Sequence, residues 1–104
     1  MRNILASSVI AAMVAGGAVA SPLEDADRAY YAGDYATALR ILRPLAEQGE
    51  AEAQGKLGFM YANGQGVPRD YPEALKWYRL AVAQGNADAQ FNLDLMEEKG
   101  LGVP

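Results

Sequence analysis

Cysteine and histidine are both absent from this chain of 104 residues. Zinc and iron sites in proteins normally use thiolate or imidazole ligands, so we expect neither a metal centre nor another cofactor. The lack of cysteine also excludes disulfide bonds, on which many small exported domains depend, and the lipid-modified cysteine of bacterial lipoproteins. The fold must therefore be held by the packing of its elements alone.

Nucleophiles are scarce as well. Beyond residue 20 the only serine is Ser21, and no Ser-x-x-Lys motif occurs. Thr37 has no base positioned near it by the sequence, so an activated nucleophile cannot be assembled. Acidic pairs occur at residues 50/52 and 97/98, but such pairs are usually solvated charges on helix faces. We predict that the chain has no catalytic residues and is not an enzyme.

Basic residues are outnumbered, because nine Lys and Arg stand against 13 Asp and Glu, which gives a net charge of −4. A surface with this balance repels phosphate groups and anionic lipids. Nucleic acid and membrane surfaces are therefore not expected partners.

Residues 1–20 have the three parts of a secretory signal peptide. Arg2 supplies the positive charge, an apolar run follows from Ile4 to Val14, and residues 18–20 place small side chains where a signal peptidase reads them. The alternative, a membrane anchor, needs about 20 strongly apolar residues, and this run is short and diluted with Ala and Gly. We predict a bacterial signal peptide that is cleaved after Ala20. Residues 21–104 would then be periplasmic or secreted, without a membrane attachment.

The rest of the chain matches itself at an offset of 36 residues, since Asp34 aligns with Asp70 and 70 − 34 = 36. The match continues without a shift to the last residue. Beyond residue 50 the recurring residues are Ala51, Ala53, Gln54, Leu57, Met60, Gly64, Gly66, Val67 and Pro68, which return as Ala87, Ala89, Gln90, Leu93, Met96, Gly100, Gly102, Val103 and Pro104. A fixed period of this size indicates stacked pairs of helices.

Helix-start and helix-stop signals divide this region into about five helices. Ser21 with Glu24 and Asp70 with Glu73 have the pattern of capping boxes, so each glutamate is expected to bond back to the backbone of its capping residue. No segment carries the pattern of a strand. The expected helices span residues 22–32, 35–48, 51–63, 71–84 and 87–99.

Small and aromatic residues recur at helix spacing, which predicts that two neighbouring helices approach closely. One stripe consists of Ala53, Leu57, Gly58 and Tyr61, and the next helix offers Ala74, Trp77, Tyr78 and Ala81. The small side chains let the backbones come close, and the large ones fill the volume beside them.

In combination, these residues resemble the Sel-1-like repeat, a relative of the tetratricopeptide repeat. The motif residues, at the spacing of the family, are Ala51, Ala53, Leu57, Gly58, Tyr61, Gly64, Gly66, Val67, Asp70, Ala74, Trp77, Tyr78, Ala81 and Gly85. The resemblance implies an all-α fold, a right-handed α/α solenoid of antiparallel helix-turn-helix repeats in which these residues serve repeat packing. It divides the chain into a divergent tetratricopeptide-like unit at 21–49, a full repeat at 50–85 and a half repeat at 86–104.

The half repeat departs from the pattern at two positions. Asp94 and Glu97 replace Gly58 and Tyr61, which in this family pack against the second helix of the same repeat. One interpretation is a polar capping surface, which solenoids need for solubility. The other is a truncated piece of a longer protein, whose open C-terminal end offers a surface for self-association.

For function, the resemblance implies an adaptor or scaffold that binds a protein or peptide partner on the concave face of the first helices. Phe59, Phe91 and Leu95 are apolar groups outside the packing positions, so they indicate either an exposed interaction patch or a groove closed by a neighbouring helix. The tyrosines at packing positions, by contrast, are expected to be structural. The outward positions of the concave face are Arg28, Tyr31, Glu52, Gly55, Phe59, Asn63, Asp88, Phe91, Leu95 and Lys99.

Two other functions stand as alternatives. Some cysteine-rich relatives of the family are linked to binding or hydrolysing β-lactams, which makes a β-lactamase-like hydrolase or a penicillin-binding protein the first alternative. The missing nucleophile argues against it. The second is a truncated remnant paralogue with little function of its own, because a solenoid usually needs about three repeats for a self-sufficient core.

Overall fold

The computed structural model describes residues 19–102, and these residues form helices and no strand. Nearly all of the predicted signal peptide, residues 1–18, lies outside the described part, as do residues 103 and 104. The helices are α2 (Pro22–Tyr31), α3 (Tyr35–Glu47), α4 (Ala51–Asn63), α5 (Tyr71–Ala83) and α6 (Ala87–Lys99).

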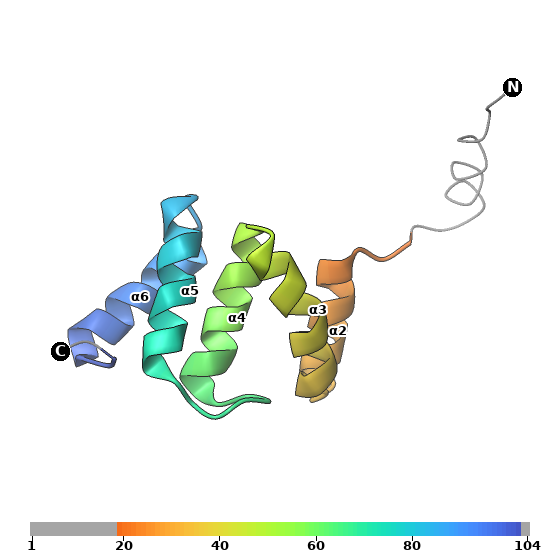
Figure 1. Cartoon of the computed structure of the whole chain (residues 1–104), viewed down its shortest axis with the longest axis horizontal. Helices are drawn as coiled ribbons and strands as arrows, with labels where there is room; N and C mark the ends of the chain where they lie inside the picture. The colour runs from red at the N-terminus through yellow and green to blue at the C-terminus, as the bar shows by residue number, and fades with distance from the viewer. Residues whose placement is uncertain (1–18, 103–104) are drawn as a thin grey trace, which may run out of the picture.

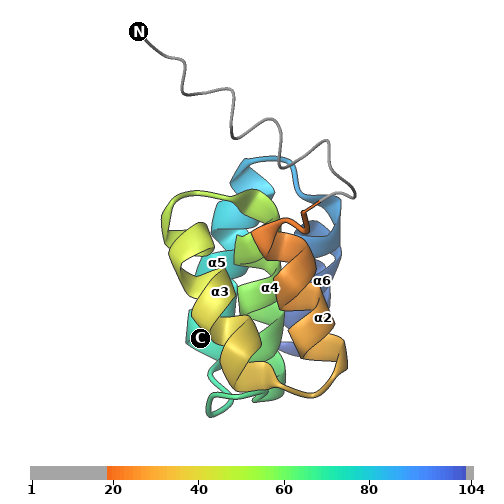
Figure 2. The same cartoon turned by 90° about the vertical axis from the view of Figure 1, so that its right-hand side faces the viewer.

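The helices are stacked in a row as antiparallel pairs (Figure 1). Turned by 90°, the molecule shows α3 and α5 on one side and α2 and α6 on the other, with α4 between them (Figure 2). Each helix packs on the next along the chain, and α4 also contacts α6. The predicted all-α helical repeat solenoid is confirmed.

Two helix starts that look alike in the sequence differ in the structure. At α2 the capping box forms, because Glu24 N donates to Ser21 Oγ at 3.1 Å and Ser21 N donates to Glu24 Oε1 at 2.9 Å. At α5 only half of it forms. Asp70 Oδ1 accepts from Glu73 N at 3.0 Å, but the Glu73 carboxylate accepts from the Trp77 indole N–H at 3.1 Å. The predicted return bond from Glu73 is wrong, because Asp70 N donates instead to the Tyr61 carbonyl oxygen at 2.9 Å, and the Glu73 carboxylate is engaged by the Trp77 indole and by Lys76 Nζ.

The closest helix contact in the repeat lies between α4 and α5, at Gly58. A Cβ atom on Gly58 would lie 2.9 Å from Tyr78 Cδ1 and 3.2 Å from the Ala74 carbonyl oxygen. Real Cβ atoms do not approach other atoms so closely, so the position requires glycine. This glycine lets the two backbones pack directly on each other, with Leu57 and Ala81 fully buried beside it.

The loops that follow α4 and α6 each dock on the second helix of the preceding unit. Gly66, at φ +78°, packs so tightly on α3 that a Cβ atom would lie 2.9 Å from Tyr35 Cβ. One period later Gly102, at φ +74°, makes the same contact with Tyr71 of α5, where a Cβ atom would lie 2.8 Å from Tyr71 Cβ. The 36-residue period is therefore a period of contacts as well as of sequence.

The buried apolar side chains form two clusters that share Tyr61 at their boundary. The first cluster fills the space between α2, α3 and α4 and includes Trp77 from α5, and the second lies between α5 and α6. Each large side chain that is fully buried contributes about 1.5–3 kcal/mol to the stability of the fold.

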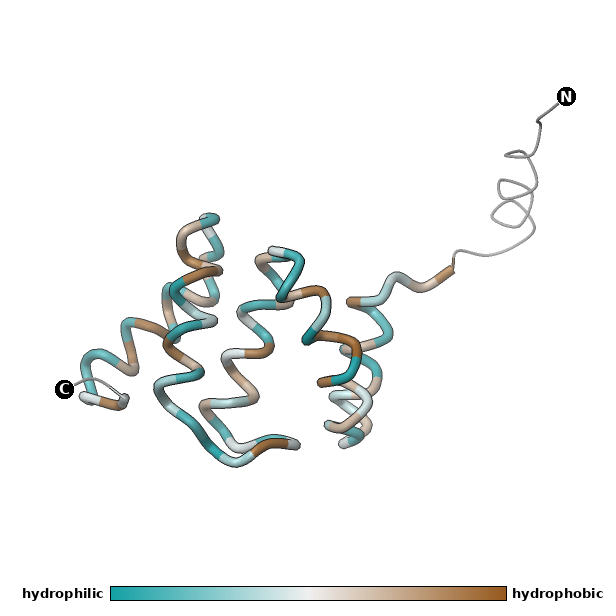
Figure 3. The backbone as a smooth tube through the Cα atoms, viewed as in Figure 1, coloured by the Kyte–Doolittle hydropathy of each residue, from teal (hydrophilic) through white to brown (hydrophobic). Residues whose placement is uncertain are grey.

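Hydrophobic and hydrophilic stretches alternate along the helices (Figure 3). Among the described helices, none is long and apolar enough to cross a membrane.

Candidate functional site

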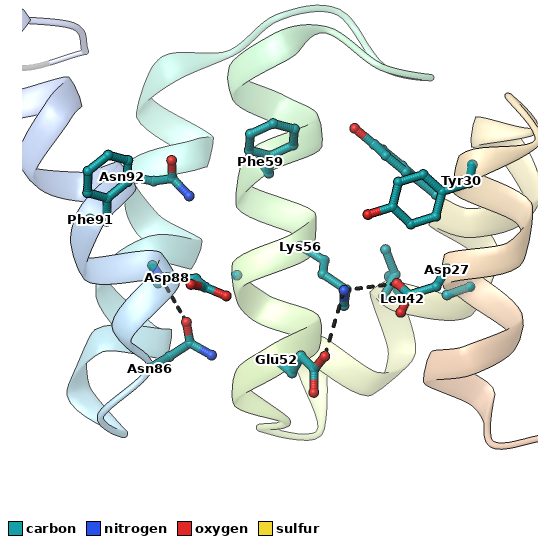
Figure 4. Close-up of a pocket in the computed structure, with 14 residues that line it drawn as sticks. Asp27, Tyr30, Leu42, Glu52, Lys56, Phe59, Asn86, Asp88, Phe91 and Asn92 are labelled. Atoms are coloured by element: carbon teal, nitrogen blue, oxygen red, sulfur yellow. Dashed lines mark hydrogen bonds and ion pairs between the residues drawn. The ribbon is translucent and has the colours of Figure 1, made fainter.

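A groove with a volume of about 680 Å³ crosses the face formed by α2, α4 and α6 (Figure 4). On α4, Gly58 faces α5, whereas Gly55 lies on the groove side next to Ala89 of α6. The groove is lined by Ala26, Asp27, Tyr30, Tyr31, Leu42, Glu52, Gly55, Lys56, Phe59, Asn86, Asp88, Ala89, Phe91 and Asn92.

An ion pair joins the two walls of the groove between α2 and α4. Lys56 Nζ lies 2.8 Å from Asp27 Oδ1 and 3.7 Å from Glu52 Oε2. Burial by itself lowers the pKa of Lys56, but the hydrogen bond and charge of Asp27, together with the charge of Glu52, outweigh this effect and raise the pKa above 10.5. Lys56 is therefore a fixed cation of the groove whose charge is already matched.

The part of the groove between α4 and α6 is apolar at its floor and aromatic at its rim. Gly55 and Ala89 form the floor, where a Cβ atom on Gly55 would lie 3.8 Å from Ala89 Cβ. The rings at the rim are exposed, Phe59 to 38% and Phe91 to 64%. A single exposed apolar residue is common, but two exposed phenylalanines within one concave surface form an apolar patch.

A smaller hollow of about 210 Å³ continues this part of the groove, since Phe59 and Asn92 line both. Tyr78 closes its base and is buried, which raises the pKa of its hydroxyl. The other residues around this hollow are Ala62, Asn63, Leu95, Met96, Lys99 and Leu101.

The predicted concave-face residues are distributed over these two hollows, with one exception. Those in the large groove are Tyr31, Glu52, Gly55, Phe59, Asp88 and Phe91, and those in the small hollow are Phe59, Asn63, Leu95 and Lys99. Arg28 lines neither, because its Nη1 pairs with Asp25 Oδ1 at 2.8 Å on the exposed side of α2. Among the described residues, no helix covers Phe91, which is 64% exposed.

Sequence reasoning missed Asp27, Tyr30, Lys56, Asn86 and Asn92. Helix geometry offered a signal for two of them, because Lys56 follows Glu52 by one turn and Asn92 adjoins Phe91. The ion pair from Lys56 to Asp27 joins different helices and has no local signal. Asn86 caps α6 by accepting from Ala89 N at 2.8 Å, so its place in the groove follows from the helix start.

The residues predicted to serve repeat packing lie mostly away from the groove, between α4 and α5. Trp77 and Tyr78 are buried, and Tyr61 is half-buried with its hydroxyl accepting from Arg43 Nη1 at 3.0 Å. Gly64, Gly66 and Gly85 have positive φ angles at the ends of helices and loops. The remaining packing residues, Leu57, Gly58, Ala74 and Ala81, are buried, and Asp70 caps α5.

Within residues 19–102, no three His, Cys, Asp or Glu side chains are grouped so that they could hold a metal ion. The arrangement instead offers an open surface with aromatic rings, carboxylates and amides.

Antiparallel helix pairs stacked in one direction, with a groove along the first helices, define this chain as an α-solenoid repeat protein. The family model of the Sel1 repeat matches residues 51–86, which span α4 and α5. The crystal structure of a Sel1 repeat protein from Oxalobacter formigenes is similar, with a TM-score of 0.73 and 36% sequence identity. That match covers 82% of this chain and 34% of the other. The comparison with curated proteins finds no match.

The chain is thus a Sel1-like repeat protein, and it spans about a third of the length of its solved relative.

Proposed function

We propose that this Sel1-like repeat protein is a non-enzymatic adaptor that binds a protein partner in the groove along α2, α4 and α6. The observation that carries the proposal is the exposure of Phe59 and Phe91 within one concave surface. Apolar rings in a groove contribute favourable free energy only when another molecule covers them, which is why such patches mark interaction sites. The family supports this role, since Sel1 repeats typically mediate protein–protein contacts.

The rigidity of the groove also supports the proposal. Its lining residues lie on helices or at their caps. Two side-chain contacts hold α2 against the full repeat, residues 50–85. Lys56 pairs with Asp27 at 2.8 Å, and the Tyr30 hydroxyl donates to Gln65 Oε1 at 3.0 Å. A surface that is already ordered loses little conformational entropy when it binds, so more of the contact energy contributes to affinity.

Affinity capture with matched variants tests the proposal. The bait is the purified chain, either wild type, the double variant Phe59→Ala/Phe91→Ala, or Leu80→Ala as the control. Leu80 is 44% exposed but lies on α5, outside both hollows. After chemical cross-linking in an extract of the producing organism, we expect mass spectrometry to find proteins that wild type and Leu80→Ala retain and the double variant loses.

Circular dichroism of each bait checks that the helices are intact before the comparison is made. If all three baits retain the same proteins in equal amounts, the partners bind elsewhere on the molecule and the proposal is wrong.

We also propose that the protein is exported and that its mature form begins at Ser21. The support is the pattern of residues 1–20, a charged start, an apolar run and small residues before the cleavage point. Expression in a bacterial host, followed by cell fractionation and intact-mass measurement, tests this. We expect a periplasmic or extracellular product that lacks the first 20 residues, and a cytosolic product that keeps them would contradict the proposal.

A further inference from the structure

We infer that the part of the groove between α4 and α6 binds an extended peptide segment in which a basic and an apolar side chain lie about three residues apart. The inference rests on the proposed function, because it specifies the chemistry of the partner in the same groove. Four features support it. They are the charge of the groove, its exposed aromatic surface, a side-chain amide without a partner in the described chain, and the spacing of the two hollows.

The groove carries more negative than positive charge. Besides its tyrosines, its ionisable side chains are the carboxylates of Asp27, Glu52 and Asp88 and the ammonium group of Lys56. Lys56 is already engaged, at 2.8 Å from Asp27 and 3.7 Å from Glu52. Asp88 forms no ion pair within the described part of the chain. A basic side chain from a partner would complement this carboxylate.

Phe91 lies about one turn after Asp88 on α6, and both residues line the groove (Figure 4). Its ring is 64% exposed. A lysine or arginine side chain has an apolar stem and a charged head, so the stem can cover the ring while the head meets the carboxylate. This pair of groups therefore favours a basic side chain over one that is only apolar or only polar.

Asn92 projects from α6 toward α4, beside Phe91 (Figure 4). It is half-buried, and its side-chain amide makes no hydrogen bond within residues 19–102. An amide side chain has both donors and an acceptor, so it can pair with one peptide unit of an extended chain. Such a pair would align the bound segment along the groove.

The small hollow lies beyond Asn92 and is apolar at Phe59, Leu95 and Met96. Its volume of about 210 Å³ is large enough for a single apolar side chain. Asp88 and Leu95 are seven residues apart on α6, a rise of roughly 10 Å along the helix axis. An extended chain covers this length in about three residues, which sets the spacing between the basic and the apolar side chain.

Selection from a display library of short random peptides on the purified chain tests the inference. We expect the selected peptides to share Lys or Arg at a distance of about three residues from Leu, Ile, Met or Phe. Fluorescence anisotropy with these peptides then measures affinity. Asp88→Asn and Phe91→Ala should each weaken binding by about fivefold or more, and added salt should weaken it further. The control is Asp94→Asn, because Asp94 lies on α6 outside both hollows and should leave affinity unchanged.

The outcomes separate this inference from the proposal on which it rests. Selected peptides without a basic residue, or peptides whose affinity Asp88→Asn leaves unchanged, overturn the inference; the groove proposal survives if Phe59→Ala/Phe91→Ala abolishes their binding. If no peptide is selected but protein partners depend on the two rings, the partner offers a folded surface and the inference is also wrong. Peptides that bind the double variant as well as wild type would refute both.

Discussion

Helices α4 and α6 occupy equivalent places in the repeat, 36 residues apart, yet their surroundings differ. Within the described residues, α4 lies between α3 and α5 and also touches α6, whereas α6 packs on α5 and on part of α4. Gln54 and Gln90 show the effect. Gln54 is 4% exposed; its Nε2 donates to the Ala46 carbonyl oxygen at 3.1 Å, and its Oε1 accepts from Gln84 Nε2 at 3.0 Å. Gln90 is exposed and bonds instead to Asp94 Oδ1 at 2.8 Å on its own helix.

The two departures from the repeat pattern follow the same rule. Gly58 and Tyr61 are packed against other helices, and their counterparts Asp94 and Glu97 are exposed. The comparison teaches that much of the repeat pattern encodes contacts between helices, because the residues that differ are those that have no helix beside them in the described chain.

The largest expected effect is that of Leu57→Ala compared with Leu93→Ala, its counterpart one period later. Leu57 is fully buried between two units, so its loss should lower the free energy of unfolding by about 3–5 kcal/mol, against about 2–3 kcal/mol for Leu93 at the less enclosed end. Urea denaturation followed by circular dichroism measures both. A greater loss at Leu93 would mean that α6 belongs to the main core, and would contradict the comparison.

Within α4, Gly58→Ala and Gly55→Ala are a matched pair. The methyl group at residue 58 meets the Ala74 carbonyl oxygen at 3.2 Å, so we expect a loss of about 1–3 kcal/mol. At residue 55 the nearest atom is 3.7 Å away, and the higher helix propensity of alanine should stabilise the protein by up to about 1 kcal/mol. Thermal unfolding of both variants checks the expected difference in sign. Equal melting temperatures would show that α4 and α5 are less tightly packed than the structure indicates.

Gln54→Ala and Gln90→Ala test the hydrogen bonds. Removal of Gln54 leaves the Ala46 carbonyl without its side-chain donor, which should cost about 1–2 kcal/mol. Removal of Gln90 breaks only an exposed bond and should change stability by less than about 0.5 kcal/mol. Denaturant midpoints of the two variants provide the measurement, and similar shifts for both would remove the distinction between the two helices.

The smallest effect concerns pH, at Lys56 and its counterpart Asn92. Because the pKa of Lys56 is raised in the folded protein, the folded state holds this proton more tightly than the unfolded state. Its contribution to stability is fully present below pH 10.5 and is lost as the pH rises through the raised pKa. Unfolding measured between pH 8 and pH 12 should therefore show a weaker loss of stability for Lys56→Gln than for wild type.

Asn92→Gln serves as the control for this series, since it carries no titrating group and should follow wild type. Tyr78 adds its own loss at high pH, because burial raises the pKa of its hydroxyl, and this loss is common to all three proteins. Parallel curves for wild type and Lys56→Gln would contradict the expected role of the ion pair.

The sequence predicted the helices well because their signals are local. The expected spans 51–63 and 87–99 coincide with α4 and α6, where capping residues and glycines mark both ends. Glu73 was assigned wrongly because its competing partner, the Trp77 indole, depends on how deeply the ring is buried. Local patterns do not report burial by other segments.

For the groove, helix geometry was enough to select the outward positions such as Phe59 and Phe91, but it could not show which of them share a hollow. Arg28 was selected by the same geometry, yet it pairs with Asp25 at 2.8 Å and lies outside. The ion pair between Lys56 and Asp27 joins residues 29 positions apart in the sequence, since 56 − 27 = 29, and only the stacking of the helices brings them together.

Trp77, the only tryptophan of the chain, belongs to α5 but is buried in the cluster formed by α2, α3 and α4. Its indole N–H is bonded to Glu73, and Lys76 Nζ lies 4.7 Å from the ring centroid. The fluorescence of Trp77 therefore reports the contact between neighbouring units. If α5 separated from the preceding helices, the indole would be exposed to water and its emission would shift to longer wavelength.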